Sequence, residues 1–186
     1  MKKCLMIIAV TMMAAMSASA QNIPAGMRME VAEAETDNSE YSIFTYKDDD
    51  ETFGYYLGLG RVINYVSIFR DDITDMSFED IKETCIWLGA TYDEAYATLD
   101  DILDLFGKDV DTTVEFKGRA ATGGDRLGEP NTSVCVVQKK PLGGKRLLFR
   151  FNCGKRQAET YLGKTVVKEL RMELKLDKKL HPKQHR

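Results

Sequence analysis

The most constraining feature of this 186-residue chain is a strict alternation of side-chain type over residues 110–120. Every second residue there is apolar or small, and the residues between them are polar or charged. Successive side chains of a β-strand point to opposite faces of the sheet, so a period of two indicates a strand with one buried face and one solvated face. The chain is therefore expected to build at least part of its core from a sheet.

Strand patterns recur on both sides of this segment. Residues 62–69 are apolar on both faces apart from Asn64 and Ser67, which predicts a central strand buried on both sides. Residues 166–176 alternate with one break at Lys168, and a helix stays an alternative there. The expected strands are residues 27–31, 41–47, 53–59, 62–69, 110–120, 132–139, 145–153 and 166–176.

Three glycines share one face of the segment that follows the Asp48–Asp50 turn. Gly54, Gly58 and Gly60 alternate there with large apolar residues. Glycines at this spacing leave a strip of sheet without side chains, so another group can approach the backbone closely. A packed helix or a bend is the expected occupant, and a ligand is the alternative.

Residues 77–106 are expected to form a helical hairpin. Phe78, Ile81, Cys85 and Leu88 recur at helical spacing, and Gly89 ends this first helix. Thr91 and Glu94 form a capping box that opens a second helix. Its apolar stripe runs to Phe106, its outer face is acidic, and Gly107 ends it.

These elements predict an α+β fold. We expect a mostly antiparallel sheet of about seven to eight strands, arranged as a sandwich or an open barrel, with the helical hairpin inserted near residues 77–106. Residues 21–176 would form a single globular domain of a size that can bury a sizeable core. Residues 177–186 are expected to be a polar C-terminal tail that frays.

The first twenty residues are typical of a cleavable export signal. Lys2 and Lys3 precede an apolar run that is shorter than the ~20 residues needed to cross a bilayer. Ala18-Ser19-Ala20 matches the small-x-small cleavage pattern, so cleavage is expected near Ala20–Gln21. The mature protein is then periplasmic or secreted, and no later segment is expected to span a membrane.

Charge is divided unequally along the mature chain. Residues 21–111 hold 22 acidic and 6 basic side chains, whereas residues 112–186 hold 7 acidic and 18 basic ones. Such asymmetry indicates either two halves that attract each other within one fold or a face offered to a charged partner.

Three cysteines follow the export signal: Cys85, Cys135 and Cys153. An odd count leaves at least one free thiol. If the hairpin of residues 132–153 turns near Leu142 and Gly143, Val136 faces Phe149 and Cys135 lies on the outer face opposite Arg150. We therefore expect no disulfide between Cys135 and Cys153, which lies on the core side.

Catalytic and cofactor motifs are sparse. The two histidines, His181 and His185, fall in the expected tail, which argues against histidine-based catalysis, and we expect neither metal nor cofactor. Asp71, Asp72 and Asp75 leave open a two-carboxylate hydrolase acting on glycan or cell-wall material. Residues 48–51 could hold calcium loosely, although a solvated turn is favoured because the spacing of a calcium loop is missing.

Basic residues on the polar sides of the expected strands are the sharpest candidate for a binding site. They would form one cationic sheet face suited to an anionic glycan, a lipid phosphate or an acidic protein, and export makes nucleic acid an improbable partner. The leading hypothesis is an exported, non-enzymatic binding protein; a secreted enzyme inhibitor that presents the loop at residues 121–131 is a further alternative. The cationic face would comprise Lys117, Arg119, Lys139, Arg146, Arg150, Arg171 and Lys175.

Overall fold

A computed structural model describes residues 23–37, 39–50, 52–60, 64–67, 83–121, 126–153 and 156–182. The expected export signal and the hydrolase candidates Asp71, Asp72 and Asp75 lie outside these residues. Along the chain the elements are β1 (Arg28–Thr36), β2 (Ser39–Lys47), β3 (Phe53–Gly58), β4 (Asn64–Ser67), β5 (Glu83–Gly89), α2 (Tyr92–Leu105), β6 (Thr113–Ala121), β7 (Asn131–Lys139), β8 (Lys145–Cys153), β9 (Arg156–Leu162) and α3 (Lys164–Leu180).

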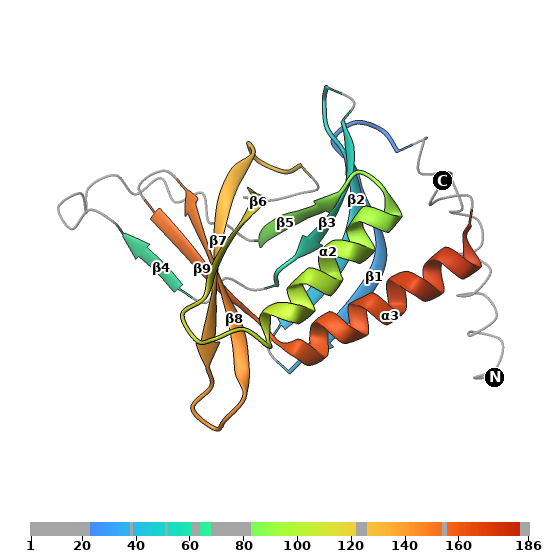
Figure 1. Cartoon of the computed structure of the whole chain (residues 1–186). Helices are drawn as coiled ribbons and strands as arrows, with labels where there is room; N and C mark the ends of the chain where they lie inside the picture. Colours follow the sequence, from blue (N-terminus) through green and yellow to red (C-terminus); the bar gives the residue numbers. More distant parts are fainter. Residues whose placement is uncertain are drawn as a thin grey trace, which may run out of the picture.

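The strands form one antiparallel sheet in the order β1-β2-β3-β5-β6-β7-β8-β9-β4 (Figure 1). Eight long strands curl into a half-barrel, and the short β4 pairs with β9 at one edge. The curl brings distant strands together, since Tyr41 Oη on β2 donates to the Tyr161 carbonyl on β9 at 3.0 Å. Thr160 Oγ1 likewise donates to the Leu59 carbonyl at 2.7 Å. The α+β class and the antiparallel sheet are thus confirmed, as a half-barrel.

Both helices pack on one face of the sheet, which we call the core face; the opposite one is the outer face. α2 lies against β5 and β3, and α3 lies against β1, β2 and α2 (Figure 1). A bulge at Val31 shifts the pairing of β1. Ala32 and Ala34 therefore face the helices on the core face. Glu30, before the bulge, is paired with Phe44 and lies with it on the outer face. The outer face has its own smaller cluster, made by Phe44, Tyr46, Tyr56 and Cys85 with Trp87 and Leu127 packed against it.

The expected helical hairpin is wrong in its first half. Residues 83–89 form strand β5 between β3 and β6, and only the second helix, α2, exists as predicted. Cys85 and Leu88 fit a helical spacing, but they lie on opposite faces of the sheet, each in an apolar cluster. A short run that is apolar on both faces cannot be assigned from periodicity, because helix and strand bury it equally well.

The expected strand at residues 166–176 is also wrong, because this segment belongs to helix α3. Val166, Val167, Leu170 and Leu174 are its buried residues, at helical spacing. Glu173 adjoins Leu174 in sequence but points about 100° away around the helix, which the alternation argument misjudged. The helix runs on to Leu180, so the first part of the expected polar tail is ordered, and His181 Nδ1 lies 2.7 Å from Asp177 Oδ1.

The apolar segment at residues 62–69 is not a central strand. Its described part, β4, pairs only with β9 and lies at the end of the strand order. Strand β9 was not predicted from the sequence, because its apolar and polar residues alternate poorly. Apolar residues on both faces indicate that a segment is buried, but they do not indicate which neighbouring segments bury it.

The β7–β8 hairpin was predicted correctly, but its register was not. Val136 pairs with Leu148 and Cys135 with Phe149, one residue away from the expected pairs. Gly143 and Gly144 both take left-handed conformations, and Lys139 pairs with Lys145, so the five-residue turn is centred on Leu142. A shift of one residue exchanges the two faces. Cys135 therefore lies buried in the core as a free thiol, while the Cys153 side chain is outside the described part.

Candidate functional site

The seven basic residues expected to share one cationic face do not all do so. Lys117 and Arg119 on β6 and Arg146 and Arg150 on β8 lie on the outer face of the sheet. Lys139 has the parity of the buried Val137 and lies at the end of β7 on the core side. Arg171 and Lys175 belong to α3, which packs on the core face.

The four outer-face cations already have intramolecular partners. Arg150 Nε lies 2.8 Å from Glu159 Oε1, and the Arg146 guanidinium lies 3.5 Å from the centre of the Tyr161 ring. Lys117 Nζ lies 5.2 Å from the centre of the Trp87 ring. Among these contacts, only the carboxylate of Glu159 compensates a positive charge, because the rings of Tyr161 and Trp87 are neutral.

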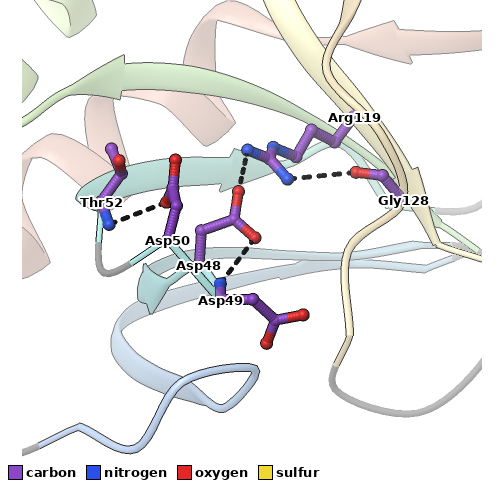
Figure 2. Close-up of polar contacts among 6 residues, drawn as sticks. All are labelled: Asp48, Asp49, Asp50, Thr52, Arg119 and Gly128. Atoms are coloured by element: carbon purple, nitrogen blue, oxygen red, sulfur yellow. Dashed lines mark hydrogen bonds and ion pairs between the residues drawn. The ribbon is translucent and has the colours of Figure 1, made fainter.

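Arg119 is bound to the acidic turn between β2 and β3 (Figure 2). Its guanidinium forms an ion pair with Asp48 and donates to the Gly128 carbonyl at 3.2 Å. Asp48 Oδ1 also accepts from the Asp49 amide, and Asp50 Oδ1 accepts from the Thr52 amide, both at 3.0 Å. The described carboxylates of this turn therefore bind protein groups, as expected of a structural turn rather than of a calcium loop.

The glycine strip of β3 makes room for side chains of the neighbouring strand β5. A Cβ on Gly54 would lie 2.5 Å from Trp87 Nε1, and a Cβ on Gly58 would lie 2.6 Å from Glu83 Oε1. The occupant is thus neither a helix nor a ligand. The two glycines allow Trp87 and Glu83 to lie flat across the outer face of the sheet.

A shallow groove of about 390 Å³ lies between α2 and α3. Tyr92 and Tyr96 stack on one wall with ring centres 5.8 Å apart, and Lys175 lines the other wall. Lys178 Nζ covers the Tyr92 ring at 3.8 Å, and the Arg171 guanidinium covers Tyr96 at 4.3 Å. These two cations also pair with Asp93 and Asp100 of α2, so the groove is closed by contacts between the helices.

A second groove, of about 850 Å³, lies along the β1–β2 hairpin, and we call it the acidic groove. Among the described residues, one cation lines it: Arg28 forms an ion pair with Glu83 and stacks over Phe44, 4.7 Å from the ring centre. This ion pair thus connects β1 to β5 across the outer face of the sheet. The acidic side chains that line the groove are Glu30, Glu33, Glu35, Asp37, Glu40 and Glu83.

Close approach of carboxylates raises the pKa of one acidic residue in this groove. A hydrogen bond with Glu33, partial burial and the nearby charges of Glu33 and Glu83 raise the pKa of Glu30 to about 7, against the opposing effect of Arg28. Glu30 therefore loses its proton near neutral pH rather than near 4.5, because two close carboxylates cannot both ionise cheaply. A bound cation would remove this penalty and drive ionisation.

The acidic groove was not predicted from the sequence, although the excess of acidic residues in the first half of the chain was visible there. Glu30, Glu33 and Glu35 lie in the acidic half of the chain, but the alternation of β1 alone places Glu30 and Glu33 on opposite faces. The bulge at Val31 brings both to the outer face, and a bulge cannot be read from the alternation.

Two other classes of site find no support in the described residues. Within them, no group of three or more His, Cys, Asp or Glu side chains is arranged to hold a metal ion. Among the same residues, neither helix combines the length and apolar character needed to cross a bilayer. Comparison of the chain with protein-family models, with curated proteins and with solved structures gave no match.

Proposed function

We propose that this chain is an exported, non-enzymatic binding protein whose ligand is a cation with several positive charges, held in the acidic groove. An oligoamine or an extended Lys/Arg-rich segment has the required chemistry. The observation that carries the proposal is a groove of about 850 Å³ whose lining, in the part of the chain that the structure describes, holds six carboxylates and one arginine. The arginine is already paired with Glu83, which leaves the excess negative charge to a ligand.

The spacing of the carboxylates favours a multivalent ligand. Glu30, Glu33 and Glu35 lie along β1, where residues two apart are separated by ~7 Å. Glu40 lies opposite Glu35 on β2, so acidic groups line both strands of the hairpin. A chain of amines can contact several of them at once, whereas a single ammonium cannot.

The test is a calorimetric titration of the mature chain, beginning at Gln21, with spermine and with a lysine-rich peptide. Binding is expected to weaken with salt and to tighten from about pH 6 to about pH 8, because Glu30 must ionise to pair with the ligand. Replacing Glu30, Glu33 and Glu35 with Gln should abolish most of the binding.

The matched control removes the same number of charges elsewhere. Asp101, Asp104 and Glu129 are exposed carboxylates outside the groove, and their amide variants should bind almost as the parent does. Equal loss in both triple variants would show non-specific attraction and would reject the acidic groove as the site.

An anionic partner is the competing binding proposal, since an anionic glycan, a lipid phosphate or an acidic protein would suit the basic residues. Heparin therefore belongs in the same titration series. Salt-sensitive binding of heparin, lost on replacing Arg146 and Arg150 with Gln, together with no binding of spermine, would favour this proposal instead. The inhibitor proposal rests on the loop at 121–131, of which residues 122–125 lie outside the described part.

A carboxylate-dependent hydrolase is a second candidate because a Glu protonated near neutral pH is what a general acid requires. Its weakness is spacing: Glu30 and Glu33 share a hydrogen bond, whereas glycosidase carboxyls are ~5 Å or more apart. Release of reducing sugar from cell-wall glycan by the parent, lost in Glu30→Gln, would favour the hydrolase.

A further inference from the structure

The outward side of α3 carries an unusual concentration of exposed apolar side chains. Met172 is 56% exposed, Leu176 43% and Leu180 74%. They are four residues apart, so they form a continuous stripe along the helix. The other large apolar residues found exposed in the described part, Met27, Val110 and Leu142, lie outside the helices and strands, in three separate segments. Isolated exposed apolar residues are ordinary, but a stripe marks an interaction surface.

Lysines border this stripe. Lys168, Lys175 and Lys179 are exposed and lie on one flank of it, with no ion pair or hydrogen bond found within the described residues. On the other flank, Glu169 and Glu173 precede residue 174. The half of the stripe that follows residue 174 is therefore the cationic one. In contrast, the cations nearest to α2, Arg171 and Lys178, are paired with its aspartates.

We propose that this side of α3 docks on an anionic lipid surface, with Met172, Leu176 and Leu180 entering the headgroup region. Lys175 and Lys179 would contact lipid phosphates, since their long alkyl stems can lie along the apolar stripe while the ammonium groups stay hydrated. The helix would lie on the membrane rather than cross it. This interaction goes beyond the proposed cation binding and uses other residues.

Shape and area favour a lipid surface over a protein. None of the three apolar residues lines either of the two grooves described above. They belong to α3, which lies on the outside of the molecule (Figure 1). A stable protein interface buries about 800 Å² on each partner, more than three partly exposed side chains can supply. A membrane contact needs only a few apolar side chains together with basic residues.

Co-sedimentation of the mature chain with phosphatidylcholine vesicles, with and without phosphatidylglycerol, tests the proposal. Binding is expected only to the anionic vesicles and should fall with salt. Met172→Gln/Leu176→Gln/Leu180→Gln and Lys175→Gln/Lys179→Gln should each weaken binding roughly tenfold or more. All these positions are exposed, so folding, followed by circular dichroism, should be preserved.

Matched controls lie on other surfaces. Leu142→Gln changes a fully exposed leucine in the β7–β8 turn, and Lys108→Gln/Lys140→Gln removes two exposed lysines away from α3. These variants should bind vesicles as the parent does. Equal binding to both kinds of vesicle, or equal loss in controls and α3 variants, would overturn the proposal. Absence of binding to both vesicles would also overturn it and would leave the stripe to an acidic protein partner.

Discussion

At the scale of single residues, the outer face shows how glycine, arginine and glutamate cooperate. Gly58 lacks the side chain that would block Glu83, and Glu83 can therefore pair with Arg28 from another strand. On β1, the bulge at Val31 brings Glu30 and Glu33 to the same face, and their hydrogen bond helps to raise the pKa of Glu30 to about 7. A missing side chain on β3 and a bulge in β1 thus both shape the acidic groove.

Glu30→Gln should change how stability depends on pH. Since its pKa is raised from 4.5 to about 7 on folding, Glu30 contributes stability that is fully present below the lower value and is lost as pH rises through the upper one. The variant cannot ionise and should lack this loss. Urea unfolding across the pH series checks this, with Asp101→Asn as the control; parallel profiles for parent and Glu30→Gln would contradict it.

The buried thiols should be unreactive in the folded protein. Burial raises the pKa of both Cys85 and Cys135 to about 12, so neither forms an accessible thiolate at neutral pH. In a mature Cys153→Ser variant, Ellman's reagent should label no thiol until denaturant is added, and then two. Rapid native labelling would show that one of these strands opens readily.

At the scale of elements, the β2–β3 turn is joined to β6 by the pair Arg119–Asp48 (Figure 2). The side chains of Arg119 and Asp48 are 12% and 25% exposed, whereas those of the neighbouring pair Arg126–Asp49 are 71% and 65% exposed. Solvent screens the second pair far more than the first. The two pairs therefore offer a comparison within one turn.

Double-mutant cycles should give a coupling free energy of about 1–3 kcal/mol for Arg119 with Asp48, measured by urea unfolding. The coupling of Arg126 with Asp49 should not exceed about 0.5 kcal/mol. Arg→Met and Asp→Asn replacements keep the approximate shape of each side chain. Equal coupling in the two cycles would mean that burial does not strengthen the first pair.

At the scale of the whole molecule, the last helix stabilises the first strand. α3 packs on β1 and β2, and its residue Leu170 is fully buried in the cluster that also holds Ala32 and Ala34. Because β1 is an edge strand with one hydrogen-bonded neighbour, it depends on this packing more than a central strand does. The two ends of the described chain should therefore unfold together.

Leu170→Ala should destabilise the protein by about 2–5 kcal/mol, since it leaves a cavity in the core. Met172→Ala, at a position that is 56% exposed, should change the unfolding free energy by less than about 0.5 kcal/mol. Hydrogen exchange should show faster exchange of both α3 and β1 in Leu170→Ala. Faster exchange confined to α3 would show that β1 is stable without the helix.

What could be inferred from the sequence is what local chemistry controls. Thr91 caps α2 as expected, accepting from the Glu94 amide at 3.3 Å, while the Glu94 carboxylate accepts from the Ala90 amide at 2.7 Å. Strand β6 follows its alternation. The glycine strip was likewise recognised as a place of close approach. Each of these depends on residues a few positions apart, whose geometry is the same in any fold.

The remaining features depend on contacts between distant segments. Residues 83–89 became a strand because β3 and β6 pair with its two edges, while α2 covers its core face. Residues 166–176 became a helix because β1 and α2 bury one side of it. The acidic groove exists because a bulge and a curled sheet bring Glu30, Glu33 and Glu83 together. Periodicity reports that a residue will be buried, but the packing of the whole chain selects the partner that buries it.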